Sequence, residues 1–281
     1  MMSFHLTISS NIGANLLVVR TPRQDHTEDF FQGVFFVWYT LLMKAIKHQV
    51  KHYYQPTNDS CGYTALAILL SHYGRTVTPS QLIKAIPQAK PDGEDGYGSI
   101  TSQLAAWCLT QGFQVDLTTF DFLIIDLEWS KLKRVDEIIK RLEAVRDVRE
   151  VTSLGKGWSK VYIEEYIKYL KAGGKLIIKP HPTIDLLYKN LAKAPIFVNV
   201  CSKPLYGNGR MRYPGVRKAV LDDVHGMVGT HSVVVYGNTE DGSFLLADPW
   251  DGLTKVTPEA LLCAIVAAEI ECDAMYFQIL D

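Results

Sequence analysis

The amino-acid sequence predicts a mixed fold of the α+β class. Most segments with helical periodicity come before residue 191. A continuous apolar run over 195–201 has the length of a buried strand. Two apolar segments, 231–238 and 243–248, are joined by a turn that ends in Gly242, which is the pattern of a β-hairpin. Helices followed by antiparallel strands are typical of the α+β class.

Turn and capping residues define the first elements. Residues 55–60 combine Pro, Asn, Asp and Ser, and a helix follows from near Cys61 to Gly74, where a left-handed residue is favoured. Thr78 and Gln81 form a capping box, with Pro at the first helical position. The elements predicted in this part are a strand over 46–54, helices over 61–73, 79–86 and 99–111, and a strand over 113–119.

The remainder alternates between helices and strands. An amphipathic, charge-rich pattern predicts a helix over 135–148. No Pro-, Gly- or Ser-rich linker isolates residues 120–182, so we interpret them as a helical insertion within one domain. The other predicted elements are helices over 161–171 and 184–191, a strand over 195–201, a long loop over 202–230, strands over 231–238 and 243–248, a helix from Thr257-Pro258, and a strand over 274–280.

Residues 1–42 differ from the rest of the chain. The first 33 residues show neither a helical nor a strand period over any length, which is typical of a flexible arm. The sequence from Met43 reads as the start of a compact domain. We therefore predict an N-terminal appendage over 1–42 and a single domain over 43–281. A helix over 29–46 that docks on the core is the alternative.

Composition excludes several classes of function. The 281 residues are 47% hydrophobic and 21% charged, with a net charge of −1, which favours a globular protein with no nucleic-acid or anionic-membrane partner. The apolar run over 34–43 is shorter than the roughly 20 residues of a membrane-spanning helix. The five Cys are scattered without a CxxC pair, so reduced thiols and a cytoplasmic location are expected. The oligomeric state stays open.

Four residues together indicate nucleophilic catalysis. Cys61 lies at the start of a predicted helix, whose positive end lowers the pKa of a thiol. His231 begins a strand and is suited to act as the base, while Asp248 ends the neighbouring strand and is suited to orient the imidazole. Gln55 precedes the helix, so its amide is placed to stabilise an oxyanion beside the Cys61 backbone N–H. Each residue alone is more typical of a structural role.

Two segments resemble the peptidase C39-like families, cysteine peptidases with a papain-like fold. QPTNDSCGYTALAILLSHYG is similar to their nucleophile segment, and GTHSVVVYGNTEDGSFLLADPWDG is similar to their His segment and following Asp-Pro. The resemblance implies a helical half that bears Cys61 and packs on an antiparallel sheet with His231 and Asp248. It assigns the nucleophile, base, orienting acid and oxyanion donor to Cys61, His231, Asp248 and Gln55.

The loop over 202–230 precedes His231 directly, and loops of this length usually have a function. We expect it to form a wall or lid of the substrate site; a surface elaboration is the alternative. The residues predicted to bind substrate are Gly62, Tyr206, Arg210, Arg212 and Trp250. The spacing of His225, His231, Asp222 and Asp223 matches no usual zinc pattern, so no metal and no other cofactor is expected.

The leading interpretation is thiol-dependent hydrolysis of a peptide or another amide through an acyl-enzyme. Two alternatives remain open. The first is acyl or peptidyl transfer, in which an amine replaces water. The second is a binding module that keeps the fold without the reaction.

Overall fold

The structure is a computed structural model that describes residues 7–9, 16–18, 44–91, 93, 98–148, 156–216, 218–226, 229–268 and 273–278. Contacts divide the chain into two units, Met1–Met43 and Lys44–Asp281. In the first unit, β1 (Thr7–Ser9) and β2 (Leu16–Val18) pair antiparallel. The alternative helix over 29–46 lies largely outside the described residues.

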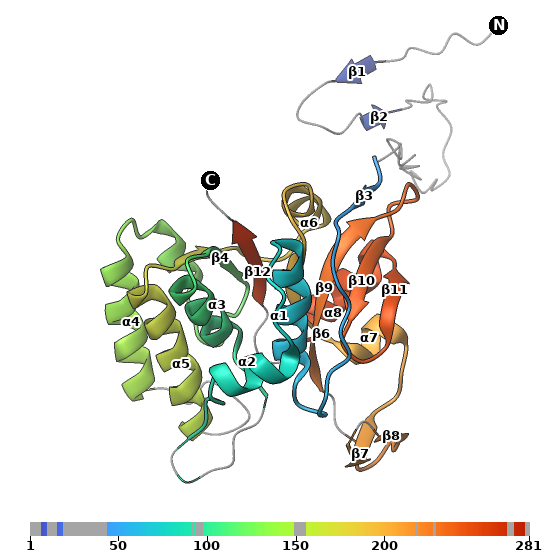
Figure 1. The fold of residues 1–281 in the computed structure, drawn as a ribbon. Coiled ribbons are helices and arrows are strands. Elements are labelled where there is room, and N and C mark those ends of the chain that lie inside the picture. Colours follow the sequence, from blue (N-terminus) through green and yellow to red (C-terminus); the bar gives the residue numbers. More distant parts are fainter. Residues whose placement is uncertain are drawn as a thin grey trace, which may run out of the picture. The chain divides into compact units, whose positions relative to one another are not determined.

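The second unit is built on one curled, mostly antiparallel sheet (Figure 1). Its strands run in the order β11-β10-β9-β6-β12-β4-β5, and β3 pairs with β9 beside this path. The β4–β5 pair is parallel, whereas the other described pairs of this sheet are antiparallel. The strands are β3 (Ile46–Lys47), β4 (Gln114–Thr119), β5 (Lys175–Ile178), β6 (Ile196–Cys201), β9 (Thr230–Asn238), β10 (Phe244–Asp248), β11 (Gly252–Val256) and β12 (Asp273–Gln278).

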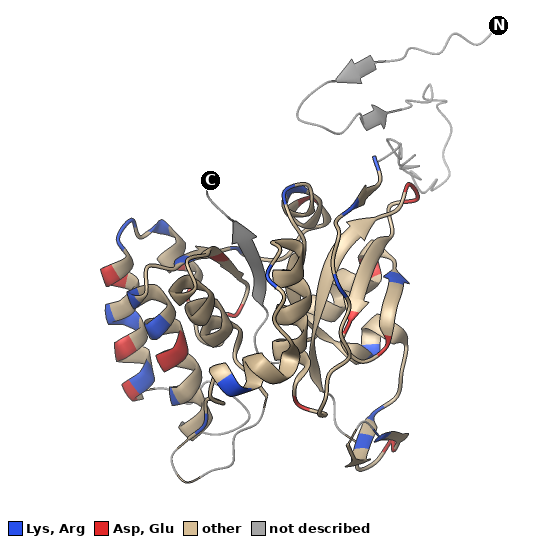
Figure 2. Cartoon of the chain, viewed as in Figure 1, with Lys and Arg blue, Asp and Glu red and all other residues tan. Residues whose placement is uncertain are grey.

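Helices cover both faces of this sheet. The helices are α1 (Cys61–His72), α2 (Pro79–Ala85), α3 (Thr101–Thr110), α4 (Val135–Val148), α5 (Lys156–Lys171), α6 (Ile184–Leu191), α7 (Ser202–Tyr206) and α8 (Pro258–Val266), with a 3₁₀ turn over Leu127–Lys131. Charged side chains gather on α4 and α5 (Figure 2). Within the described residues, no helix combines the length and apolar character needed to cross a bilayer.

Strand alternation divides the core in two. Val234 and Tyr236 of β9 join the cluster formed with α1, whereas Val233 and Val235 join the cluster formed with α6 and α8. This is the two-residue period of a strand that is buried on both faces. The predicted α+β architecture, with the Cys61 helix packed on an antiparallel sheet, is confirmed.

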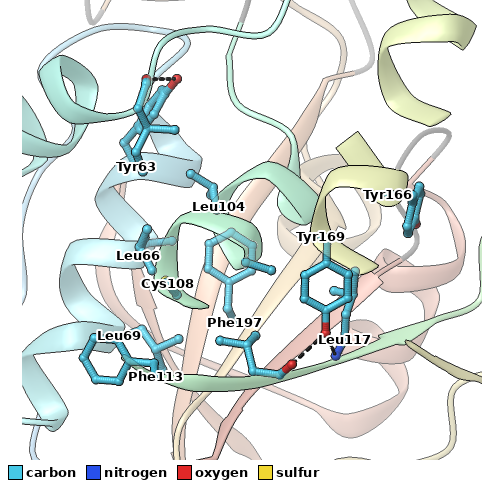
Figure 3. Close-up of a cluster of buried hydrophobic side chains, with 14 of the residues drawn as sticks. Tyr63, Leu66, Leu69, Leu104, Cys108, Phe113, Leu117, Tyr166, Tyr169 and Phe197 are labelled. Atoms are coloured by element: carbon cyan, nitrogen blue, oxygen red, sulfur yellow. Dashed lines mark hydrogen bonds between the residues drawn. The ribbon is translucent and has the colours of Figure 1, made fainter. Parts of the chain in front are cut away.

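The segment 120–182 shares the larger of these cores. Side chains of α4 and α5 pack with those of α1, α3 and Phe197 of β6. Figure 3 shows Tyr166 and Tyr169 of α5 in this cluster. The hydroxyl of Tyr169 lies 2.6 Å from the carbonyl of Val115 and 2.9 Å from that of Lys175, and its single hydrogen is donated to one of them at a time. Its oxygen accepts from the N–H groups of Leu117 (3.1 Å) and Lys175 (3.0 Å). This buried hydroxyl ties α5 to β4 and to the start of β5.

Two sequence predictions need correction. Residues 202–230 are not one long loop, because α7 is followed by a hairpin of β7 (Met211–Gly215) and β8 (Lys218–Leu221). The strand predicted over 46–54 is formed only over Ile46–Lys47. Strands β5 and β11 were not predicted, since they are short and their pairing partners are set by the tertiary fold.

Candidate active site

Cys61 occupies the first position of α1. The preceding Ser60 makes no capping bond to the helix, because its hydroxyl accepts from the N–H of Thr57 and donates to the Thr57 carbonyl, both at 3.0 Å. No acidic residue lies in the first helical turn. The first amides at this positive end, where Cys61 lies, therefore have no competing side-chain acceptor from the cap.

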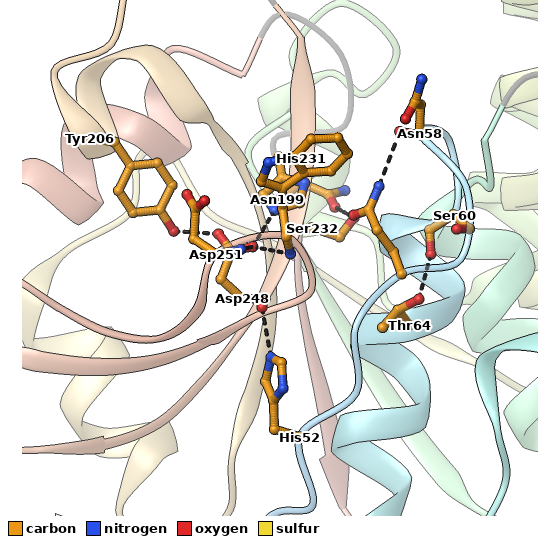
Figure 4. A network of polar contacts seen from close by, with 12 residues as sticks. His52, Asn58, Ser60, Thr64, Asn199, Tyr206, His231, Ser232, Asp248 and Asp251 are labelled. Carbon is orange, nitrogen blue, oxygen red and sulfur yellow. Dashed lines mark hydrogen bonds and ion pairs between the residues drawn. The ribbon is translucent and has the colours of Figure 1, made fainter. Parts of the chain in front are cut away.

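His231 and Asp248 meet at one end of the sheet. They lie near the start of β9 and at the end of β10, and antiparallel pairing brings those two ends together. The Nε2 atom of His231 lies 2.8 Å from Oδ1 of Asp248 (Figure 4). This contact leaves the other ring nitrogen to face Cys61, whose thiol is hydrogen-bonded with the His231 side chain. The structure thus brings Cys61, His231 and Asp248 together.

The carboxylate of Asp248 is fully buried and densely hydrogen-bonded. Besides the His231 contact, Oδ1 accepts from the backbone N–H groups of Trp250 (2.6 Å) and Asp251 (3.1 Å). The Tyr206 hydroxyl donates to Oδ2 (Figure 4). The His52 ring Nε2 donates to the Asp248 backbone carbonyl at 2.8 Å. These contacts fix the acid in one orientation toward His231.

Electrostatics favour the charged form of all three residues. Burial alone would lower the pKa of His231, but the Asp248 charge and hydrogen bond, together with Cys61, raise it to about 10. Burial would raise the pKa of Asp248, whereas the charge and hydrogen bonds around it lower it to about 2. Burial would likewise raise the pKa of the Cys61 thiol, but His231 and Ser232 bring it below its ordinary value. The site is therefore suited to a thiolate–imidazolium pair.

Gln55 is buried beside this group, but its amide is used within its own loop. Its Nε2 donates to the carbonyls of Thr57 (2.7 Å) and Asn58 (3.2 Å). The backbone N–H of Gln55 also donates to the Pro249 carbonyl at 2.9 Å, which joins the nucleophile segment to the end of β10. To donate to an oxyanion, the amide would have to release one of its two bonds, and the Asn58 bond is the longer.

The residues predicted to bind substrate occupy different surroundings. Tyr206 and Trp250 line a cavity beside His231, whereas Gly62 is buried against Ser99, whose Oγ would lie 2.1 Å from an added Cβ. Arg210 and Arg212 are exposed, and the Arg212 guanidinium lies 3.3 Å from Asp222. The structure therefore brings Tyr206 and Trp250 to the site and does not bring the two arginines or Gly62 into the cavity lining.

The cavity has a volume of about 110 Å³ and extends from His231 toward the β7–β8 hairpin. The Tyr213 ring of β7 packs edge-on to Trp250, with centroids 6.0 Å apart. Asn58 of the nucleophile loop donates to the Gly215 carbonyl at 2.9 Å. These two contacts hold the hairpin against the site as one wall. The full lining is Ser202, Lys203, Tyr206, Asn208, Met211, Tyr213, Ala219, Gly229, Thr230, His231, Asp248, Trp250 and Asp251.

Three residues at the site were not found from the sequence. Ser232 lies beside the Cys61 thiol, and its backbone and its hydroxyl lower the pKa of that thiol. Tyr213 lies close enough to Cys61 for burial and the thiolate charge to raise its pKa. His52 contacts the Asp248 carbonyl. The sequence offered only their positions as a signal: Ser232 follows His231, Tyr213 lies in the 202–230 segment, and His52 precedes Gln55.

Within the described residues, no group of three or more His, Cys, Asp or Glu side chains is arranged to hold a metal ion.

Comparison with known families gives a match in the first part of this domain. Residues 47–145, about a third of the chain, match the family model described as "Peptidase_C39 like family". The resemblance seen in the nucleophile segment is thereby confirmed. The match contains Gln55 and Cys61, while His231 and Asp248 lie beyond its end.

Two solved structures are similar over most of the chain. A candidate C39-like peptidase from Bacillus anthracis is 14% identical, with a TM-score of 0.43, and the likeness covers 85% of this chain and 100% of that one. Xylellain, a cysteine protease from Xylella fastidiosa, is 12% identical, with a TM-score of 0.37 and coverage of 84% and 86%. The comparison with curated proteins gives no match.

Proposed function

We propose that this chain is a cysteine peptidase-like hydrolase that cleaves a peptide or another amide through an acyl-enzyme on Cys61. One observation carries the proposal: the thiol at the start of α1 is hydrogen-bonded with His231, whose Nε2 lies 2.8 Å from the buried Asp248. The match of residues 47–145 to the C39-like family supports a cysteine peptidase-like function.

The reaction begins with the Cys61 thiolate, whose proton is held by His231. Sulfur attacks the substrate carbonyl, and the carbonyl oxygen becomes an oxyanion near the first amides of α1. Gln55 serves as a second donor when its amide turns away from the Asn58 carbonyl. His231 then gives its proton to the departing amine, and Asp248 keeps the ring oriented throughout. Water attacks the thioester with His231 as base, which releases the acid product and restores the thiol.

The cavity accommodates the part of the substrate that departs with the amine. His231 delivers the proton to the departing amine, so that amine must lie on the His231 face, where the cavity begins. The aromatic rings of Tyr206, Tyr213 and Trp250 contribute to its lining. We therefore assign substrate contact on this side to Tyr206 and Trp250, and add Tyr213 to the wall.

The test is incubation of the chain with a library of random-sequence peptides, followed by mass spectrometry of new termini. Wild type is expected to cleave a subset of the peptides and to form a thioester on Cys61, whereas Cys61→Ala does neither. Added glycinamide distinguishes transfer from hydrolysis, because transfer yields peptidyl-glycinamide in place of the free acid. Cleavage by Cys61→Ala would refute the proposed nucleophile. Peptide binding by wild type without a thioester would favour a binding module.

A further inference from the structure

A polar pair lies under Cys61 on a sheet face that is otherwise apolar. Asn199 of β6 and Ser232 of β9 are paired across the two strands and are both buried. Neighbours on the same face, Phe197 and Val234, belong to the hydrophobic core with α1. Burying polar side chains in such a place is unfavourable unless they are hydrogen-bonded, so this pair needs a local explanation.

The pair belongs to a chain of hydrogen bonds that ends beside the thiol. The Ser232 hydroxyl donates to Asn199 Oδ1 at 2.7 Å, and Asn199 Nδ2 donates to the hydroxyl of Thr101 at 2.5 Å (Figure 4 shows Asn199, Ser232 and His231). Thr101 is the first residue of α3. At the other end, the backbone and the hydroxyl of Ser232 lie close enough to Cys61 to lower the pKa of its thiol.

A hydroxyl carries a single hydrogen, so Ser232 can donate to Asn199 or to sulfur, but not to both at once. A neutral thiol or a thioester is a weak acceptor, and the amide oxygen of Asn199 then takes the bond. A thiolate is a charged acceptor, and hydrogen bonds to charged groups are the stronger ones. Ionisation of Cys61 therefore favours rotation of the hydroxyl toward sulfur, while the thiol proton passes to His231.

We propose that Ser232 is a second side-chain donor to the Cys61 thiolate, and that Asn199 is a positioning residue that holds the Ser232 hydroxyl below the sulfur. The inference rests on the thiolate nucleophile of the proposed function. It assigns Ser232 a role that is separate from the ion pair with His231, because the hydroxyl would act on the sulfur itself and carries no charge.

Other groups around the sulfur define what the test must separate. His231 of β9 supplies the positive charge, and the α1 amides supply the helix N-terminus. Burial and the Cys61 charge raise the pKa of Tyr213 of β7, and Asp248 and Asp251 act on the pKa values of His231 and Tyr213. A change in the thiol pKa is therefore informative only when it is measured with His231 both present and removed.

The experiment is the pH dependence of Cys61 alkylation by iodoacetamide, followed by mass spectrometry of the peptide that contains Cys61. Ser232→Ala is expected to raise the midpoint by about one pH unit, which slows alkylation about tenfold well below the midpoint. Ser232→Thr keeps a hydroxyl and is expected to restore the wild-type midpoint. Ser102→Ala is the matched control, because Ser102 Oγ is a buried hydroxyl without a hydrogen-bond partner in the described structure.

Two double variants separate the roles. The shift from Ser232→Ala is expected to persist in a His231→Gln background, and Asn199→Ala is expected to add no shift once Ser232 is alanine. Disappearance of the shift in His231→Gln would overturn the proposal, because Ser232 would then act by placing His231. An unchanged midpoint with a lower melting temperature would also overturn it, as a purely structural role. Ser232→Gly repeats the test if Ser232→Ala does not fold.

This readout needs no substrate, so it stays valid if no peptide is cleaved. A wild-type midpoint near 8.5 that is insensitive to His231 would instead refute the thiolate pair of the proposed function.

Discussion

Replacement of Asp248 by Asn removes one charge and keeps the shape of the site. Oδ1 accepts from His231, Trp250 and Asp251, so the Asn oxygen can take the same three bonds. Oδ2 accepts from Tyr206, and the Asn amide nitrogen can occupy that position because a tyrosine hydroxyl also accepts. Asp248→Asn therefore tests the charge on His231 rather than the packing of a fully buried side chain.

The size of the effect follows from the geometry. His231 is 14% exposed and its ring nitrogen lies 2.8 Å from Asp248. An opposite charge this close shifts a pKa by about 1–3 units, and each unit is worth about 1.4 kcal/mol. We expect Asp248→Asn to cost about 2–4 kcal/mol of unfolding free energy where the pair is fully charged.

The pH window is set by both partners. The pKa of His231 is raised to about 10, so its contribution is complete below its ordinary value of 6.5 and is lost as the pH rises toward 10. The pKa of Asp248 is lowered to about 2, so its contribution is complete above 3.8 and is lost as the pH falls through 2. The cost of Asp248→Asn is therefore greatest between about pH 4 and 6.5.

The assay is urea unfolding at pH 5.5 and 9.5 in a Cys61→Ala background, where the thiol no longer titrates. Without the thiolate, the pKa of His231 lies lower, so most of the pair's contribution is gone at pH 9.5. The difference in unfolding free energy between this background and its Asp248→Asn variant should shrink by more than about 1 kcal/mol between the two pH values. Asp251→Asn, at an exposed neighbour, is the matched control and should change little. An equal difference at both pH values would refute the charged pair.

Three other variants test the surroundings of the site. Gln55→Ala should lower kcat of wild-type cleavage about 10²–10³-fold with KM little changed, if the amide stabilises the oxyanion; an unchanged kcat would remove Gln55 from that role. Asn58→Ala breaks the bond to the Gly215 carbonyl and should raise KM severalfold while the Cys61 alkylation midpoint stays constant; a shifted midpoint would contradict a role confined to the cavity wall. Tyr169→Phe removes the hydroxyl from the buried Val115 carbonyl and Leu117 N–H and should cost about 1–3 kcal/mol in urea unfolding; a cost near zero would contradict the anchoring of α5.

Local signals predicted the helices well. The helix at Cys61 begins as expected, and the capping box at Thr78 is present with both of its bonds. Helices 135–148 and 184–191 have the predicted bounds. Caps and periodicity act within a few residues, so the sequence carries this information directly.

Pairing between distant strands was not predictable in the same way. Lys175–Ile178 follows two glycines, but its parallel partner β4 lies far earlier in the chain. The hairpin over 211–221 has few apolar alternations and an irregular register, so its sequence resembles a loop. The hydrogen bond between Ser232 and Asn199 likewise depends on the register of β6 against β9.

The same distinction explains how the candidate site is assembled. Local rules place Cys61 at a helix start and His231 and Asp248 at neighbouring strand ends, but they do not set the distance between the two groups. That distance depends on contacts that cross between the halves: His52 with the Asp248 carbonyl, Gln55 with the Pro249 carbonyl, and Ser232 with the thiol. Since two of these lie in the extended segment just before Cys61, changes there should alter the pH dependence of the thiol while leaving α1 and the strands intact.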